Sequence, residues 1–202
     1  MDKKKYFLEI FRKAERKYGK AEKRLAGEGW GAAWKILVAT IMSAQSRDET
    51  TIPVAEELFR KYGSLEKLAD AKYEDVLKIF KSLNYNLTKA KNVIAAAKYI
   101  RNKGRVPEEI DELIKIPGVG RKTANLVRWE AFGEHGICVD THVHRISNVL
   151  GFVKTKTPEQ TERELEKIVP RRLWGKVNRV FVLWGKDVRG RSRERILARI
   201  GL

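Results

Sequence analysis

Two side chains of this sequence are of types that can carry covalent or charge-stabilising chemistry, and each stands at the start of an expected helix. Lys122 follows Arg121, and Asp140 comes 18 positions after Lys122, at the end of the apolar segment 137–139. A neutral lysine amine is a nucleophile, and a carboxylate stabilises positive charge that develops beside it. Each side chain also has a simpler interpretation, Lys122 as a phosphate-binding lysine and Asp140 as a helix N-cap. The helices and turns that position the two residues help to decide between these interpretations.

Lys122 lies in a segment that predicts two short amphipathic helices around a tight turn. The first helix begins at Pro107 with acidic residues near its positive end, and its buried stripe consists of Leu113, Ile114 and Ile116. Gly118 and Gly120 supply unusual backbone angles and lack a Cβ, so that a phosphate can approach bare amides. The second helix opens at about Arg121, and its N–H groups and positive dipole end point at the same phosphate.

The complete string Pro117-Gly-Val-Gly-Arg-Lys-Thr-Ala indicates a helix-hairpin-helix, which grips the DNA backbone without reading base sequence. Small Ala124 allows the two helices to pack closely, and Val119 and Val127 attach the turn to the core. Because glycine and proline are frequent in many loops, the alternative is an ordinary corner between two helices.

The charge balance agrees with a polyanionic partner. Of 202 residues, 43 are Lys or Arg and 26 are Asp or Glu, which gives a net charge of +17. So large an imbalance is unusual for an enzyme that acts on neutral metabolites. The alternative explanation is a heavily solvated, heat-adapted surface.

Apolar residues recur at helical spacing nearly everywhere, as in Phe7, Ile10, Phe11 and Ala14, so we predict an all-α protein of about ten to twelve helices. Thr157 and Pro158 mark the start of one helix, which ends before Pro170. Two further helices are expected at residues 56–63 and 86–101, each closed by a nearby glycine. Arginines crowd the last fourteen residues, and they form either a phosphate-contacting helix or a frayed, solvated end.

The single cysteine, Cys138, excludes a disulfide framework and any metal or iron–sulfur centre held by cysteines alone. His135, Cys138, His142 and His144 fall within ten residues, but their spacing fits no common zinc site, and we reject a metal cluster there. The start of the chain lacks the apolar stretch of a signal peptide, and no apolar run is long enough to span a bilayer. We therefore expect an intracellular, cytoplasmic protein that makes no membrane contact.

Beyond these arguments, the sequence resembles the endonuclease III family of helix-hairpin-helix DNA glycosylases. The resemblance rests on Leu113-Ile-Lys-Ile-Pro-Gly-Val-Gly-Arg-Lys-Thr-Ala-Asn, on Val139-Asp-Thr-His-Val-His-Arg and on Met42-Ser-Ala-Gln-Ser-Arg-Asp. Phe132 and Gly133 match the usual end of the second hairpin helix. Together these matches cover most of the chain, from about Trp34 to Pro170.

The resemblance implies a fold of two helical lobes that flank a DNA-binding cleft. Residues 25–132 form a six-helix barrel that contains the hairpin at 107–130, and residues 1–24 and 133–202 form the second lobe. It implies that Lys122 is the nucleophile and Asp140 the catalytic carboxylate. Gln45 fills the space of the extruded base, and Tyr85 lies near the wedge that enters the base stack, although Asn84 stands where the family usually has glycine.

The remaining implied site residues contact DNA or hold an ion. The DNA-binding residues are Gln45, Tyr85, Gly118, Val119, Gly120, Arg121, Thr123 and His142, the last of which orients groups around Asp140. The backbone carbonyls of Ile114, Ile116 and Val119 match places where such hairpins hold a monovalent cation; no other cofactor is expected.

One departure from the family is the absence of the C-terminal four-cysteine iron–sulfur loop. Packing must hold the lobe instead, with contributions from Trp174, Phe181 and Trp184. We therefore expect a monomeric DNA repair glycosylase with abasic-site lyase activity, acting on duplex DNA with a damaged pyrimidine, a mismatched base or an abasic site. The alternatives are a monofunctional uracil or thymine mismatch glycosylase, against which Lys122 argues, and a non-catalytic DNA-binding module.

Overall fold

The computed structural model describes residues 2–134 and 136–202. Every regular element in these ranges is helical, with twelve α-helices and no strand, which confirms the predicted fold class. The chain divides into two compact units. We call Arg24–Gly133 the central unit, and Met1–Lys23 together with Glu134–Leu202 the terminal unit. No helix among the described residues is both long and apolar enough to cross a membrane.

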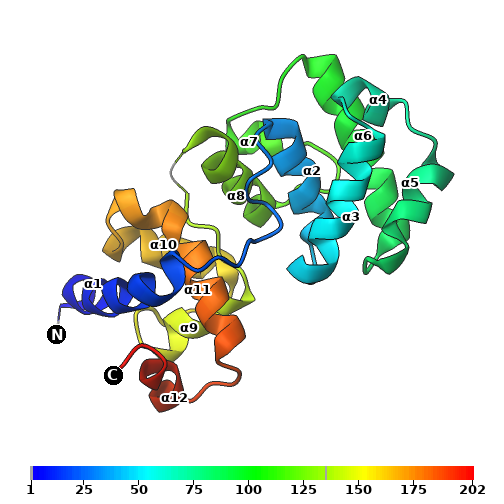
Figure 1. Ribbon diagram of the computed structural model, residues 1–202. Helices are drawn as coiled ribbons and strands as arrows, with labels where there is room; N and C mark the ends of the chain where they lie inside the picture. Colours follow the sequence, from blue (N-terminus) through cyan, green and yellow to red (C-terminus); the bar gives the residue numbers. More distant parts are fainter. Residues whose placement is uncertain (1, 135) are drawn as a thin grey trace. The chain divides into compact units, whose positions relative to one another are not determined.

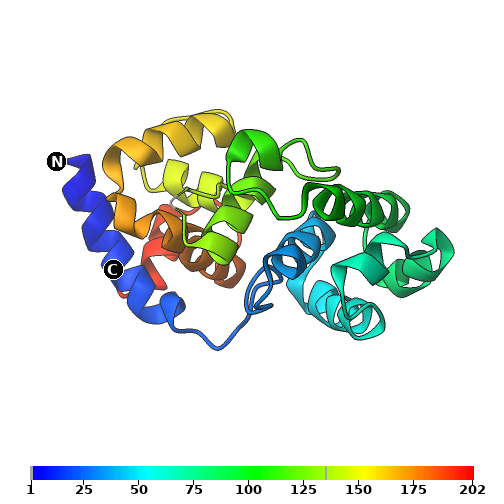
Figure 2. The same ribbon diagram turned by 90° about the horizontal axis from the view of Figure 1, so that it is seen from above.

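The central unit is built around α2. Residues 36–42 of this helix are all buried, and all of them except Thr40 are apolar. Helices α3, α6 and α8 contact α2 (Figures 1 and 2). The elements of this unit in chain order are α2 (Ala33–Ser43), α3 (Asp48–Lys61), α4 (Leu65–Ala69), α5 (Tyr73–Ile79), a 3-10 turn (Phe80–Ser82), α6 (Asn86–Lys103), α7 (Ile110–Leu113) and α8 (Arg121–Phe132).

Two of these helices test the sequence predictions directly. Helix α6 begins at Asn86 as expected and is closed by Gly104, whose φ is +77°. Helix α3 begins at Asp48, eight residues before the expected start at Glu56, and Pro53 lies inside it. The prediction missed this first half because proline and β-branched residues disfavour a helix locally, whereas burial of Thr51 and Val54 stabilises it.

The terminal unit has a core of aromatic rings. Phe7, Phe152 and Phe181 are almost fully buried, and the ring centroids of Phe7 and Phe152 lie 5.1 Å apart. Phe181 also contacts the ring of Trp184 at 5.7 Å, edge to face. The elements of this unit are α1 (Lys3–Ala14), a π-helical turn (Glu15–Gly19), α9 (Thr141–Val149), α10 (Pro158–Ile168), a 3-10 turn (Arg171–Leu173), α11 (Trp174–Asp187) and α12 (Arg193–Ala198).

The cap of α10 is the one predicted, since Thr157 accepts the amide of Gln160 and Pro158 is the first helical residue. The Gln160 side chain accepts the amide of Lys156 at 2.9 Å, one residue before the cap. Trp184, expected to hold this unit together, is fully buried, whereas Trp174 is half-buried and donates to the carbonyl of Val169.

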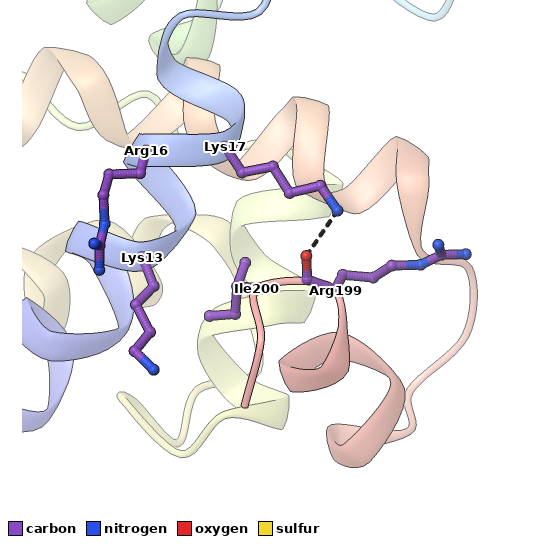
Figure 3. Close-up of a pocket in the computed structure, with 5 residues that line it drawn as sticks. All are labelled: Lys13, Arg16, Lys17, Arg199 and Ile200. Atoms are coloured by element: carbon purple, nitrogen blue, oxygen red, sulfur yellow. Dashed lines mark hydrogen bonds between the residues drawn. The ribbon is translucent and has the colours of Figure 1, made fainter.

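The arginine-rich C-terminal segment contains a packed helix, α12, and is not the frayed end that was the alternative expectation. Ile196 of α12 is fully buried, and its carbonyl accepts a hydrogen bond from the Trp184 indole at 3.1 Å. Lys17 donates to the carbonyl of Arg199 at 2.7 Å (Figure 3). A pocket lies where this segment packs beside α1 and the π-helical turn that follows it. It is lined by Lys13, Arg16, Lys17, Arg199 and Ile200.

Candidate active site and nucleic-acid interface

The hairpin of the central unit is shorter on its first side than the sequence predicts. Helix α7 begins at Ile110 rather than at Pro107. The carbonyl of Glu108 accepts a hydrogen bond from the Arg128 side chain at 2.9 Å, which holds residues 106–108 along α8 outside the helix. Because α7 ends at Leu113, the next residue leaves the buried stripe. Leu113 and Ile116 are buried, but Ile114 is 46% exposed, so its predicted burial is wrong.

The two glycines of the turn differ in backbone conformation and in what surrounds them. Gly118 has φ of +82°, and a Cβ there would lie 2.9 Å from the Asn92 side chain of α6. Gly120 has an ordinary extended backbone, with φ of −96° and ψ of 177°, which corrects the expectation of unusual angles at both positions. A Cβ on Gly120 would meet nothing within 4 Å. Gly118 thus serves the fold, whereas Gly120 leaves open space before the first turn of α8.

Lys122 is the second residue of α8, directly after Arg121 and the N-cap Gly120. Its side chain is exposed. The charge of the adjacent Arg121 and the positive end of the helix lie next to it. Ala124 and Val127 are fully buried, which agrees with the packing predicted for them. Thr123, expected among the DNA-binding residues, is only 9% exposed.

A second cluster in the central unit joins the segments that contain Gln45 and Tyr85. Both residues have positive φ, +54° and +56°, and they are the non-glycine residues with this conformation in the described part of the chain. The Asn84 side chain donates to the carbonyl of Gln45 at 2.7 Å, and the Asn84 amide donates to Ser46 Oγ at 3.1 Å. The structure therefore brings these two segments together and leaves the Gln45 and Tyr85 side chains exposed.

Lys89 and Leu87 belong to the same cluster and were missed by the sequence analysis. Lys89 Nζ donates to Ser46 Oγ at 2.7 Å, and the residue is only 5% exposed. Burial lowers the pKa of Lys89 to about 8. The signal was present, since Lys89 precedes Val93, Ala96 and Ile100 at the spacing of a buried stripe. Leu87, by contrast, is 58% exposed, and Tyr85, two residues before it, is 65% exposed.

In the terminal unit, Asp140 is the N-cap of α9, which was the simpler interpretation of this residue beside a catalytic role. Its Oδ1 accepts the amides of His142 at 2.9 Å and Val143 at 2.8 Å. The cap thus uses one carboxylate oxygen. Arg145, one turn along α9, donates to the carbonyls of Gly185 and Val188 at 2.9 and 2.8 Å, which ties α9 to the end of α11.

His142 packs against α11 at Gly185. A Cβ on Gly185 would lie 2.8 Å from the Cβ of His142, so only glycine permits this approach of the two helices. The site residues therefore fall into two groups. Gln45, Tyr85 and the hairpin belong to the central unit, and Asp140 and His142 belong to the terminal unit.

The residues present do not fit an iron–sulfur cluster. Cys138 is 2% exposed, and its carbonyl accepts the Asn178 side chain at 3.1 Å, which fixes it in the interior of the terminal unit. With one cysteine among 202 residues, four thiolate ligands are not available. Among the described residues, no group of three or more His, Cys, Asp or Glu side chains is placed to hold a metal ion, and His135 lies outside them.

Comparisons with known proteins agree on one family. Residues 38–171 match the family described as HhH-GPD superfamily base excision DNA repair protein. Endonuclease III of Thermotoga maritima is 43% identical over 157 residues, which are 77% of this chain and 74% of that protein. Endonuclease III of Bacillus subtilis is 37% identical over 156 residues, 76% of this chain and 71% of that protein.

Solved structures give the same result. A trapped covalent intermediate of endonuclease III with DNA matches with a TM-score of 0.85 and 30% identity, over 94% of this chain and 89% of that chain. A thermostable thymine-DNA glycosylase matches with a TM-score of 0.81 over 98% of this chain and 93% of that chain, but at 18% identity it shows only a shared fold. The chain belongs to the endonuclease III family of the HhH-GPD superfamily of base excision DNA repair proteins.

Proposed function

We propose that the protein is a bifunctional DNA glycosylase and abasic-site lyase that removes oxidised or otherwise damaged pyrimidines from duplex DNA. The observation that carries this proposal is the position of Lys122, an exposed amine in the first turn of α8, directly after the open glycine turn. The proposal is supported by the endonuclease III relatives and by the solved complexes of such enzymes with DNA.

The hairpin binds the DNA backbone. Backbone amides at the start of α8, the positive dipole end and Arg121 all favour a phosphate in the open space before Gly120. These contacts carry no sequence information, so they hold any duplex equally and place the sugar next to the phosphate within reach of Lys122.

The Gln45 and Tyr85 side chains stabilise an opened base stack. An enzyme that acts on a base inside a duplex must extrude the nucleotide, at a cost of a few kcal/mol that a damaged or mismatched pair reduces. Tyr85 supplies an exposed aromatic ring that can stack on neighbouring bases, and Gln45 supplies hydrogen-bonding groups for the orphaned partner base.

Asp140 and Lys122 carry the reaction. The neutral Lys122 amine attacks the sugar C1′, the bond between C1′ and the base breaks, and the base leaves with the bonding electrons and takes up a proton. Asp140 stabilises the positive charge that develops on the sugar while its Oδ1 stays in the helix cap. The attacking nitrogen then loses a proton, the C1′–O4′ bond of the sugar ring opens, and O4′ takes up a proton, which leaves a Schiff base between Lys122 and C1′. The Schiff base acidifies the C2′ proton, whose loss expels the 3′ phosphate, and water then hydrolyses the C=N bond and releases the enzyme.

The carbonyls of Ile114, Ile116 and Val119 are the groups that would hold a monovalent cation at the hairpin. The Ile116 carbonyl accepts the Val119 amide at 3.0 Å, but a carbonyl oxygen has two lone pairs, so the donor set fits such an ion. A bound cation would add positive charge beside the DNA phosphate.

A panel of duplexes tests the proposal. Each contains one oxidised pyrimidine, a uracil or thymine mismatch with guanine, or an abasic site, and base release and strand nicking are scored separately. We expect base release and nicking on the oxidised pyrimidine, with a covalent adduct when borohydride is present. Base release without an adduct would instead indicate a monofunctional mismatch glycosylase, and inactivity on every duplex would leave a DNA-binding module.

A further inference from the structure

Two residues of the central unit are held in a backbone conformation that side chains rarely adopt. Gln45 has φ of +54° and Tyr85 has φ of +56°, and residues other than glycine adopt such angles only when their surroundings enforce them. Both are exposed, so burial of their side chains does not provide that enforcement. The hydrogen bonds beneath them must do so.

The Asn84 side chain donates directly to the carbonyl of Gln45 at 2.7 Å, and the other hydrogen bonds converge on Ser46 and Lys89. Ser46 Oγ accepts one bond from the Asn84 amide at 3.1 Å and another from Lys89 Nζ at 2.7 Å. The Lys89 amide donates to the carbonyl of Tyr85 at 3.0 Å. Lys89 therefore bonds both segments, the first through its side chain and the second through its backbone.

The burial of Lys89 has no other evident use. Its amine lies on the core side of α6, and Ser46 is the partner that the structure gives it. Burial lowers the pKa of Lys89 to about 8, with no contribution from a neighbouring charge. A methionine or leucine would fill the same space without this penalty, so the amine is retained for the bond that it makes.

We propose that Lys89 is a positioning residue that, through Ser46, holds Gln45 and Tyr85 in the left-handed conformation needed to enter the DNA base stack. The inference rests on the proposed function, because it assigns Lys89 a part in base extrusion. Tyr85 is 65% exposed and Leu87 is 58% exposed, so the segment held in this way presents two large apolar side chains to solvent. Because this segment is already ordered in the free protein, DNA binding does not have to offset the entropy cost of ordering it.

The test uses Lys89→Met, which keeps the length and the apolar stem of the side chain and cannot leave a charge buried. Lys98→Met is the matched control, since Lys98 is an exposed lysine on the same helix. The first readout is single-turnover base release from a duplex with an oxidised pyrimidine. The second is the fluorescence of 2-aminopurine placed next to an abasic-site analogue, which rises when the stack opens.

We expect Lys89→Met to lower base release on the order of 10-fold or more and to reduce the fluorescence rise, because small misplacement of positioning groups has effects of this size. Affinity for undamaged duplex should stay unchanged, since the hairpin is intact, and Lys98→Met should match the wild type. Ser46→Ala removes this bond together with the one from the Asn84 amide, so its defect should be at least as large, and the double variant should lose no more than Ser46→Ala alone.

The outcomes separate the two proposals. A wild type that releases base, with Lys89→Met equal to it in both readouts, overturns the role of Lys89 alone. A wild type that releases no base from any duplex overturns the proposed function and this inference with it. If Lys89→Met does not fold, Ser46→Ala tests the link by the same two readouts, and wild-type behaviour of Ser46→Ala overturns the inference.

Discussion

The side chain of Asn92 occupies the space into which a Cβ on Gly118 would project. The Asn92 Cβ lies 2.9 Å and its amide nitrogen 3.0 Å from that position, so helix α6 closes against the hairpin turn. Gly120, two residues along, faces open space. The same turn therefore contains one glycine required by the fold and one that the fold does not require.

We expect Gly118→Ala to destabilise the protein by on the order of 2–3 kcal/mol, from left-handed strain together with the Asn92 contact. Gly120→Ala should leave the free energy of unfolding nearly unchanged and yet weaken binding to undamaged duplex, because its methyl group enters the space assigned to phosphate. Urea unfolding and duplex titration at one fixed salt concentration measure the two effects. Undiminished DNA affinity in Gly120→Ala would mean that the turn is only a corner between helices.

At Gly185 we expect a change in stability opposite to the one that helix propensity alone predicts. Replacement of glycine by alanine inside a helix normally stabilises by about 1 kcal/mol. At Gly185 the new methyl group would lie 2.8 Å from the His142 Cβ, so Gly185→Ala should lower the melting temperature and shift α9, whose first turn is capped by Asp140. Base release should fall with it. Thermal unfolding of Gly185→Ala provides the check, and a raised melting temperature would contradict the close packing of these helices.

The sequence predicted those features that depend on local pattern. The buried face of α1 and the cap of α10 at Thr157 each follow from residues within a few positions of one another, and the end of α8 at Gly133 was implied by the family resemblance. It failed where tertiary contacts override local preference. The first half of α3 contains Pro53, and residues 106–108 are held along α8 by Arg128, so neither boundary was readable from its own segment.

In the candidate site, too, features set by local sequence were predictable and features set by tertiary contacts were not. The αL conformation of Gly118 and the cap by Asp140 were predictable, because glycine and aspartate have known preferences there. The link between Lys89 and Ser46 spans 43 positions and arises only when the two segments pack together. Its one sequence signal, a lysine on a buried stripe, does not name a partner.

Lys89 also predicts a dependence of stability on pH. Its pKa is about 8 in the folded protein, below the value of 10.5 for an exposed lysine, so the folded state releases this proton first. Stability therefore rises as pH increases between about 8 and 10.5, and below pH 8 the full penalty of burying the charge is present. The contribution is at most roughly 3 kcal/mol. The difference in free energy of unfolding between wild type and Lys89→Met should follow this rise across the window, and a constant difference would contradict it.

Asp140→Asn separates the cap from the charge. The asparagine carbonyl can still accept the amides of His142 and Val143, and asparagine is as good an N-cap as aspartate, so the melting temperature should change little. The negative charge beside the developing sugar cation is lost, and base release should fall by roughly 10²–10³-fold without loss of duplex affinity. Single-turnover base release and a binding titration test this, and full activity in Asp140→Asn would assign Asp140 to the cap alone.

Lys122→Gln tests the covalent step. The side chain lies exposed in the first turn of α8, where glutamine is tolerated, so folding and duplex affinity should be largely retained. The amide cannot form a Schiff base, and the adduct that borohydride traps with the wild type should disappear together with strand nicking. Lys98→Met, which alters an exposed lysine far along α6, should trap as the wild type does. An adduct that persists in Lys122→Gln would place the nucleophile at another amine, and the exposed setting of Lys122 would then serve phosphate binding alone.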